Sequence, residues 1–444
     1  MKSKSFYSFL IILLALVWSV SVVQAQDVKE TTLFTNVKVF NGVDEKLLDA
    51  DVLVEGNLIK QVSKDIKAPK GAQVIDGKGS VLMPGLIDAH WHTMYIGFPL
   101  ATLANGDMIE AAARAVPKAK NVLMRGFTTV RDMGGPSEGL KTVIDEGVIP
   151  GPRILPSGPG ISQTSGHFDY RQYAGVPFNT ADPMEYWYRT RMFAVADGKD
   201  EMIRRVRENL RMGAAQIKLA TGGGVSSVYD PLDVAEYTLE EIKAAVDVAT
   251  DFNTYVATHV MTDRAIMKSI EAGVKSIEHG YFASDETLQL MAKKGIWLCP
   301  QPFFEGDLEY PDADRSEKFE QVVKNTARLY QNAKKYGVKL GFGTDLLMNP
   351  PSENQGAQLA RLATWMSPYE VLKIATSENA KMLEMSGPRH PYKNGPLGVI
   401  KEGAYADIIL VNGNPLENLD LVADAENNFV VIMKDGNIYK NIID

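Results

Sequence analysis

The feature that most constrains the fold is a regular alternation of short apolar segments and amphipathic helices between residues 85 and 390. Eight of these segments are predicted strands: LIDAHWH, FTTVRDM, RILPSG, AAQIKLA, TYVATHV, VKSIEHG, IWLCP and VKLGFGTD. Thr238 and Glu241 have the spacing of a capping box, which marks the start of the helix before TYVATHV. Such alternation predicts an α/β fold with a parallel sheet covered by helices, and eight units favour a closed (β/α)8 TIM barrel.

The two ends of the chain differ from this middle part. Residues 26–84 and 391–444 contain β-branched runs separated by turn signals such as Asn41-Gly42 and Asp76-Gly77. We expect these two ends to form one small β-sandwich domain beside a barrel domain of residues 85–390.

Residues 1–25 are predicted to be a signal peptide. Lys2 and Lys4 precede an apolar stretch centred on residues 9–18, and Val23-Gln24-Ala25 resembles a small-residue cleavage site. We expect cleavage after Ala25, export to the periplasm or the medium, and no stable membrane insertion of the mature chain. An uncleaved anchor helix is the alternative, because the apolar stretch is only slightly short for a membrane span.

Composition narrows the classes of partner. The formal net charge of −8 argues against a nucleic-acid partner, so we expect a small-molecule substrate. Cys299 is the only cysteine, which leaves no internal disulfide, and its apolar surroundings favour packing over a nucleophilic role. A homo-oligomer is the expected assembly.

Four of the six histidines lie at the ends of predicted strands. His90 and His92 end the first strand, and alternate residues of a strand point to the same face, so both imidazoles can reach one metal ion. His259 and His279 end the fifth and sixth strands, and Asp345 ends the eighth. Barrel strands open with their C-terminal ends on one rim, where active sites are built, and imidazole and carboxylate suit a divalent metal. These residues therefore predict a metal centre.

The segment MPGLIDAHWH, residues 83–92, and the tail GAYADIIL resemble the amidohydrolase superfamily. Its members are metal-dependent hydrolases built on a (β/α)8 barrel flanked by a β-sandwich, and the resemblance covers essentially the whole mature chain. Lys218, in QIKLATGGG, occupies the place where binuclear members carry a lysine carboxylated by carbon dioxide. A buried ammonium is costly. The resemblance implies that Lys218 is instead a carbamate, which bridges two divalent cations that we expect to be zinc.

The resemblance implies six metal ligands: His90, His92, Lys218, His259, His279 and Asp345. The first two histidines and the aspartate would bind one ion, and the other two histidines the second. Carboxylated Lys218 and a hydroxide would bridge the pair, and the hydroxide would attack the substrate carbonyl. Asp345 would orient the hydroxide, take its proton and pass it to the leaving amine as the catalytic acid–base.

Two residues are predicted to bind substrate. His167 lies in the loop GISQTSGHFD after the third strand, where prolidase-like members place a histidine against the substrate carbonyl or carboxylate. Tyr229, in GGGVSSVYD, could supply a hydroxyl or be a packed aromatic residue. The backbone amides of the glycines in that turn could receive an anion. The acids of PFFEGDLEYPDAD could attract a cationic substrate side chain or be solvated loop residues.

The glycine run after Lys218 and the His167 loop are most similar to the group containing prolidases, Xaa-Lys and Xaa-Arg carboxypeptidases and an ochratoxin-degrading amidase. The resemblance therefore implies hydrolysis of an amide or peptide bond next to a free carboxylate. A one-metal enzyme resembling imidazolonepropionase or a deaminase is the alternative with the same fold, although such enzymes generally lack the lysine of the fourth strand. A non-catalytic exported binding protein is the alternative from another class.

Overall fold

The computed structural model describes residues 30–97, 99, 106–171, 190–227, 229–310, 312–347 and 352–443. The predicted signal peptide, residues 1–25, lies outside the described residues. Among the helices of the described ranges, none combines the length and the apolar character that a membrane span requires.

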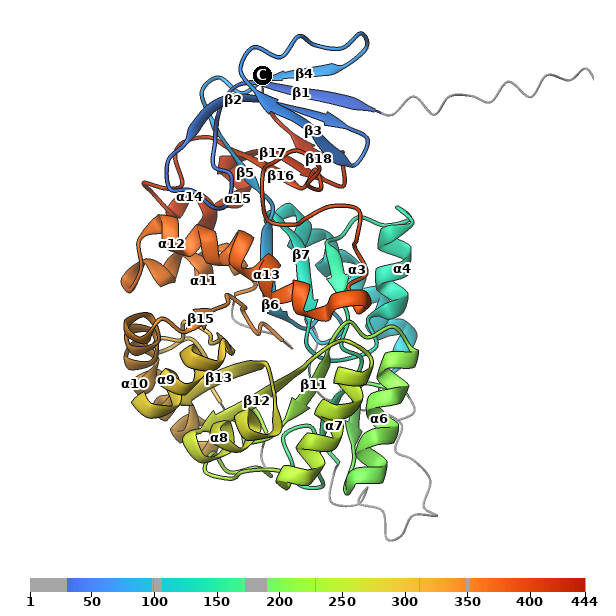
Figure 1. Ribbon diagram of the computed structural model, residues 1–444, viewed down its shortest axis with the longest axis vertical. Coiled ribbons are helices and arrows are strands. Elements are labelled where there is room, and N and C mark those ends of the chain that lie inside the picture. Colours follow the sequence, from blue (N-terminus) through green and yellow to red (C-terminus); the bar gives the residue numbers. More distant parts are fainter. Residues whose placement is uncertain are drawn as a thin grey trace, which may run out of the picture.

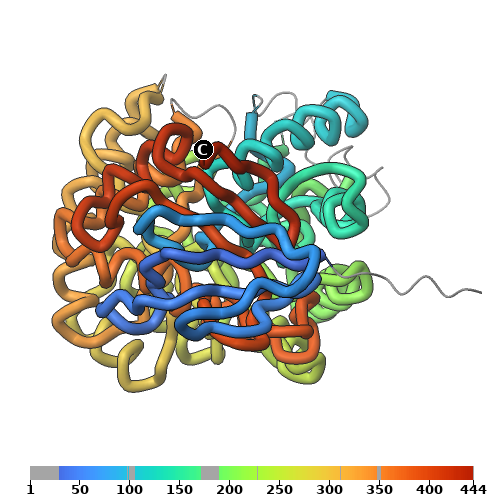
Figure 2. The backbone as a smooth tube through the Cα atoms, turned by 90° about the horizontal axis from the view of Figure 1, so that it is seen from above, coloured from blue at the N-terminus to red at the C-terminus, as the bar shows by residue number. Residues whose placement is uncertain are grey.

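An eight-stranded sheet at one end of the molecule combines strands from both ends of the chain. Its strands are β1 (Thr31–Val39), β2 (Leu48–Glu55), β3 (Leu58–Ser63), β4 (Gln73–Asp76), β5 (Val81–Pro84), β16 (Ile408–Val411), β17 (Phe429–Lys434) and β18 (Asn437–Asn441). Their order is β18-β17-β16-β5-β1-β2-β3, and β4 pairs with β1. The two halves meet where β16 runs antiparallel to β5, so blue and red strands lie side by side in Figures 1 and 2.

The eight segments predicted as barrel strands all form strands. These are β6 (Leu86–Trp91), β7 (Phe127–Asp132), β8 (Arg153–Leu155), β11 (Ile217–Ala220), β12 (Val256–Thr262), β13 (Ser276–Phe282), β14 (Trp297–Cys299) and β15 (Lys339–Leu340). Two short strands that the sequence analysis did not anticipate, β9 (Gly160–Ser162) and β10 (Phe193–Val195), extend the sheet beside β11. All pairings among these strands are parallel.

Backbone hydrogen bonds join the two parallel sheets, β6-β7-β8 and β10-β9-β11-β12-β13-β14-β15, on both sides. On one side Ala89 N donates to Phe342 O over 2.9 Å, and Asp345 N donates to His90 O over 2.8 Å. On the other side Ala215 N donates to Pro156 O over 2.7 Å. The predicted α/β class with a (β/α)8 TIM barrel is confirmed.

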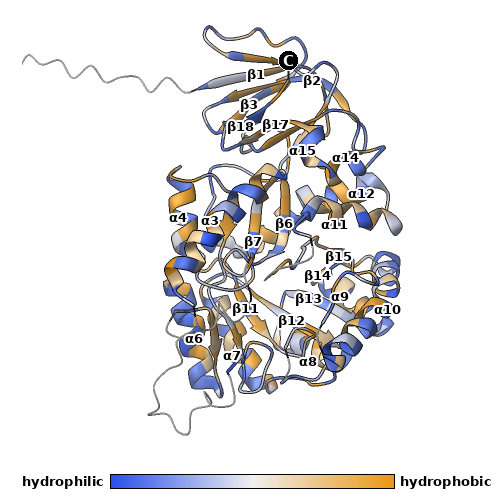
Figure 3. Cartoon of the chain, turned by 180° about the vertical axis from the view of Figure 1, so that it is seen from behind, coloured by the Kyte–Doolittle hydropathy of each residue, from blue (hydrophilic) through white to orange (hydrophobic). Residues whose placement is uncertain are grey.

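Helices cover the outside of the barrel (Figure 1). They are α3 (Met108–Met124), α4 (Glu138–Asp145), α6 (Lys199–Arg211), α7 (Leu239–Asp251), α8 (Asp263–Ala272), α9 (Asp285–Lys294), α10 (Ala313–Tyr336), α11 (Gln355–Arg361), α12 (Pro368–Lys373) and α13 (Asn379–Leu383), with the short α14 (Asp420–Ala423) and α15 (Ala425–Asn428) near the terminal sheet. Hydropathy explains why the strands lie inside and the helices outside. In Figure 3, β11 is hydrophobic, whereas α6 and α10 are largely hydrophilic. The predicted capping box of Thr238 and Glu241 begins α7.

Candidate metal centre and active site

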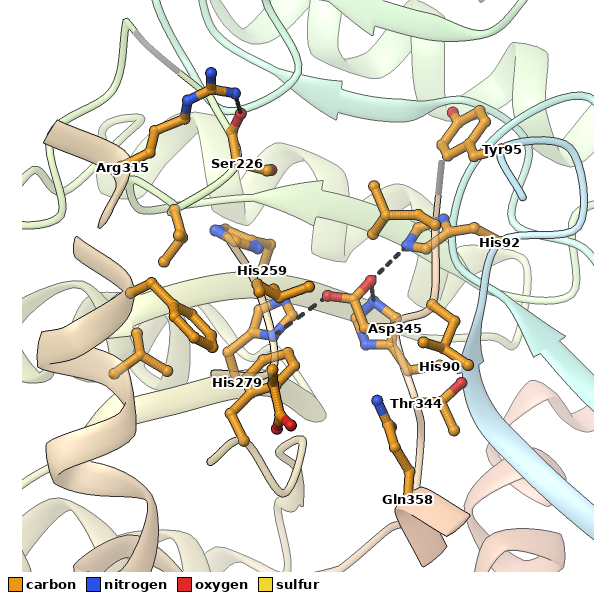
Figure 4. Close-up of a pocket in the computed structure, with 18 of the residues that line it drawn as sticks. His90, His92, Tyr95, Ser226, His259, His279, Arg315, Thr344, Asp345 and Gln358 are labelled. Atoms are coloured by element: carbon orange, nitrogen blue, oxygen red, sulfur yellow. Dashed lines mark hydrogen bonds and ion pairs between the residues drawn. The ribbon is translucent and has the colours of Figure 1, made fainter. Parts of the chain in front are cut away.

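The six predicted metal ligands converge in one cavity at the C-terminal ends of the barrel strands. They are His90 on β6, His92 directly after it, Lys218 on β11, His259 on β12, His279 on β13 and Asp345 after β15. Figure 4 shows the Asp345 carboxylate between three of the imidazoles. One carboxylate oxygen, Oδ1, lies 3.0 Å from His92 Nε2 and 3.4 Å from His90 Nε2. The other, Oδ2, lies 4.0 Å from His279 Nδ1.

Lys218 and the second pair of histidines lie in the same group. Lys218 Nζ is 3.5 Å from His90 Nε2, and its side chain is only 1% exposed. The rings of His259 and His279 are 4.4 Å apart between centroids, and those of His90 and His279 are 5.1 Å apart. The barrel therefore brings both histidine pairs, the lysine and the aspartate to one place.

Two of these residues have a backbone conformation that non-glycine residues rarely adopt. His279 has φ of 70° and Asp345 has φ of 52°, both in the left-handed region. Such conformations cost free energy and cluster at functional sites, where the surrounding structure holds them. His279 lies within β13 and Asp345 follows β15, and both residues line the cavity.

Burial controls the charges of the group. It lowers the pKa of His90 to about 3 and that of His279 to about 4, and it holds the pKa of His259 well below its usual range. These imidazoles are therefore neutral at neutral pH. Burial alone would raise the pKa of Asp345, but His90 and the other imidazoles lower it, so the carboxylate is ionised. Burial also lowers the pKa of Lys218 to about 8.

This donor set fits divalent metal ions. Neutral imidazoles and an ionised carboxylate are the ligands that zinc and similar cations prefer. One atom each of His90, His279 and Asp345 lie within 4.8 Å of one another, close enough to hold a single ion. The residues present are therefore suited to a metal centre.

A buried ion pair behind the cavity fixes the orientation of His90. Glu278 Oε2 lies 2.8 Å from His90 Nδ1, and both Glu278 oxygens accept hydrogen bonds from Arg131 at 2.8 and 2.9 Å. Because the carboxylate can only accept, Nδ1 donates to it and Nε2 is left facing the centre. This pair was not predicted from the sequence, although charged residues inside the apolar runs FTTVRD and SIEHG were a usable signal.

The other imidazoles are held at one nitrogen in a similar way. His279 Nδ1 lies 2.7 Å from Gln301 Oε1, and His259 Nε2 lies 3.2 Å from Gly223 O. His92 differs, because its Nδ1 is buried and has no hydrogen-bond partner within the described ranges. Partners of this kind set which ring nitrogen carries hydrogen and which is free to bind a metal.

Of the two predicted substrate residues, the structure brings only His167 to the centre. Its ring stacks face to face on His259, with centroids 3.7 Å apart and planes inclined by 10°. Tyr229 is 45% exposed and is not among the described residues that line the cavity. The glycine turn before Tyr229 does receive a carboxylate, but that carboxylate belongs to the protein, because Gly224 N donates to Asp230 Oδ2 over 2.7 Å. Asp230 had not been singled out from the sequence.

The cavity has a volume of about 800 Å³, and two aromatic groups contribute to its lining beside the candidate metal ligands. One aromatic group surrounds Phe193, which contacts Tyr95 and Tyr170 at centroid distances of 5.1 and 4.9 Å. A second group surrounds Phe319, whose ring is 5.5 Å from that of Phe303. These two aromatic groups form apolar walls of the cavity, and the candidate metal ligands form its polar part.

Charged residues complete the walls of the cavity. Arg315 lies over the ring of Tyr310 and donates to the backbone of Ser226 (Figure 4), and Arg361 pairs with Asp307 at 2.6 Å. Asp307 is therefore already neutralised by an arginine. Among the acids considered from sequence, Glu309 lines the cavity and is exposed, whereas Glu305 is not among the lining residues that the structure describes.

Comparisons with known proteins identify the family of the chain. The sequence profile of the amidohydrolase family matches residues 81–444. An ochratoxinase of Aspergillus niger is 30% identical over 435 residues, which cover 94% of this chain and 88% of the ochratoxinase. The crystal structure of an amidohydrolase has a TM-score of 0.85 and 36% identity, covering 93% of this chain and 100% of that one.

A second crystal structure is that of a prolidase in complex with N-methylphosphonate-L-proline. It has a TM-score of 0.83 and 33% identity, and it covers 93% of this chain and 100% of the prolidase. The family match spans most of the chain, and these relatives share the barrel that carries the candidate metal centre. The chain belongs to the amidohydrolase family and is a hydrolase that acts on carbon–nitrogen bonds.

Proposed function

We propose that the protein is a two-metal hydrolase that cleaves the amide bond of a dipeptide or an N-acyl amino acid next to a free carboxylate. The observation that carries this proposal is Lys218, which lies in the same cavity as two pairs of histidines and an aspartate. The likeness to a prolidase and to an ochratoxinase supports an amide substrate.

We assign Lys218 as carboxylated. Its Nζ is buried, and no carboxylate of the described residues forms a salt bridge with it. Burial disfavours the ammonium and favours the neutral amine, which is the form that attacks the carbon of carbon dioxide. A new N–C bond forms, one proton is released, and the product is a carbamate anion. That anion supplies negative charge between the two histidine pairs, where two dications, expected to be zinc, would need it.

The His90, His92 and Asp345 side chains would hold one metal ion, and His259 and His279 the other. Divalent cations bound there make a water molecule more acidic and polarise the substrate carbonyl. Asp345 takes the proton of the attacking water as the new C–O bond forms. It then gives that proton to the leaving nitrogen as the C–N bond breaks, which yields a carboxylic acid and an amine.

The walls of the cavity indicate the substrate class. The aromatic groups around Phe193 and Phe319 suit a substrate with apolar or aromatic groups. The Arg315 guanidinium and the His167 ring provide places for a carboxylate or carbonyl oxygen. Asp307 is paired with Arg361, which leaves Glu309 as the acid available to a cationic side chain on this wall.

The test is a screen of dipeptides and N-acyl amino acids on metal-loaded protein, with each substrate paired with its C-terminal carboxamide. We expect hydrolysis, a higher kcat/KM for the free carboxylates, and about two metal ions per chain by elemental analysis. Removal of metal by a chelator should abolish activity, and added metal should restore it. One metal per chain would support the imidazolonepropionase-like or deaminase alternative, and no turnover on any amide would contradict the proposal.

A further inference from the structure

We propose that Asp230 is a positioning residue for His167, holding Nδ1 of the imidazole so that Nε2 is left for the substrate. The inference rests on the proposed function, in which His167 contacts the substrate. It assigns a role in this reaction to a residue that the metal-ligand pattern does not reveal.

The contacts of Asp230 show what it holds. The residue is fully buried, and its Oδ2 lies 3.0 Å from His167 Nδ1 and 2.7 Å from Gly224 N. Its Oδ1 accepts a hydrogen bond from Ser227 Oγ, which also lies 2.9 Å from His167 Nδ1. A carboxylate only accepts, so the hydrogen between it and His167 is carried by Nδ1. Nε2 makes no hydrogen bond within the described ranges, and His167 lines the cavity.

Gly224 allows this arrangement to lie against the metal centre. A Cβ atom at this position would be 2.2 Å from His167 Cε1, 2.3 Å from His167 Nδ1 and 2.8 Å from His259 Nε2. The backbone of the loop after β11 can therefore contact the rings of His167 and His259 only because residue 224 is a glycine without a side chain. The loop that follows Lys218 thus delivers both the Gly224 amide and the Asp230 carboxylate to His167.

The backbone of His167 has a separate anchor. Its N–H donates to Glu236 Oε1 over 3.0 Å, so Glu236 places the loop whereas Asp230 holds the ring. Because the ring of His167 lies flat on His259, a substrate oxygen at Nε2 would be next to the metal centre. Without the Asp230 carboxylate, Ser227 Oγ could donate to Nδ1, and the ring would then carry its hydrogen on Nε2.

A double-mutant cycle tests this role on the metal-loaded enzyme, with Asp230→Asn, His167→Ala and the double variant. We expect Asp230→Asn to lower kcat/KM by about 10- to 100-fold, mainly through KM, with metal content unchanged. In the His167→Ala background the same change should have no further effect. Asp197→Asn is the matched control and should leave activity unchanged. Asp197 accepts hydrogen bonds from Thr164, which lies at the outer edge of the loop that carries His167.

Nitrogen-15 NMR of the histidine rings gives a readout independent of activity, and six histidines make assignment feasible. In the zinc-loaded protein, Nδ1 of His167 should carry hydrogen, and Asp230→Asn should change that signal selectively. If Asp230→Asn does not fold, Asp230→Ser replaces it, since a hydroxyl can still accept from Gly224 N.

Two results would overturn the inference: wild-type kcat/KM with an unchanged His167 signal in the Asp230 variant, or an equal loss in both backgrounds, which indicates a purely structural role. An enzyme that hydrolyses no amide would instead refute the proposed function, and the NMR signal would still test the contact.

Discussion

The proposed chemistry depends on two residues, Asp345 and Lys218, and these two residues have different contacts. Asp345 touches the imidazoles of both halves of the centre, whereas Lys218 has only His90 Nε2 within hydrogen-bonding distance among the described residues. Asp345 was predicted from its place after an apolar strand, whereas Lys218 was predicted only from the resemblance to binuclear members of the superfamily. Asp230 was not predicted, because its contact with His167, 63 residues earlier in the chain, depends on how two loops pack together.

Replacing Asp345 by asparagine should remove the acid–base group while most of the site remains. We expect kcat to fall by about 10²–10⁴-fold, with a much smaller change in KM, measured on protein whose metal content has been verified. Asp247→Asn is the control, because that aspartate pairs with Lys243 on the exposed face of α7. A metal-replete Asp345→Asn enzyme with near wild-type kcat would remove Asp345 from the mechanism.

Lys218→Ala should lower metal content and activity together, because the proposed carbamate between the metal sites would be lost. Short carboxylic acids added at high concentration should restore part of both by occupying the vacated position. Lys218→Arg should not rescue, since a guanidinium keeps its charge and cannot be carboxylated. Elemental analysis and kcat/KM measured on the same samples check this, and full metal content with full activity in Lys218→Ala would contradict it.

At the scale of elements, the loop after β11 is the piece that joins the lysine strand to the rest of the site. The glycine run was expected to form a turn whose backbone amides could receive an anion of the substrate, but Gly224 N donates to the side chain of Asp230. His90 and His92 lie at the end of β6 as predicted, because the 2-residue period of HWH is a local feature, whereas β12 and β13 continue three residues beyond His259 and His279. The short strands β9 and β10 were not predicted, since a three-residue strand has too little sequence pattern to detect.

Gly224→Ala tests this element. The added methyl group would meet the rings of His167 and His259 at distances under 3 Å, so the loop or the rings must move. We expect lower metal affinity and a loss of kcat/KM, with secondary structure retained by circular dichroism. Gly139→Ala in α4 is the matched control, because nothing lies within 4 Å of its Cβ position and alanine favours helix. Equal activity of the two variants would contradict this account of the loop.

At the scale of the whole molecule, the barrel is tied to the terminal sheet by a buried arginine. Arg153 of β8 pairs with Asp407 at 2.9 Å and with Asp435 at 2.6 Å, and its guanidinium lies 4.0 Å from the Tyr405 ring centroid. The composition of the two ends predicted strands from both termini, and one sheet contains them. The arginine link was not predictable, because it depends on how the two parts pack.

Export is the prediction for the molecule as a whole. The basic start, the apolar stretch and the small-residue site before Gln26 predict a leader that a signal peptidase removes. N-terminal sequencing of protein from a host with a secretory pathway should begin at or near Gln26. Intact Met1 on membrane-bound protein would instead support the anchor-helix alternative.

A crystal structure of the metal-loaded enzyme would show whether Lys218 is a carboxylated residue between two metal ions, as we propose. We predict electron density for a carboxylate group continuous with Lys218 Nζ, flanked by two metal peaks, one near His90 and His92 and one near His259 and His279. An unmodified amine at Lys218, in a crystal of fully active enzyme with two metals bound, would contradict the account.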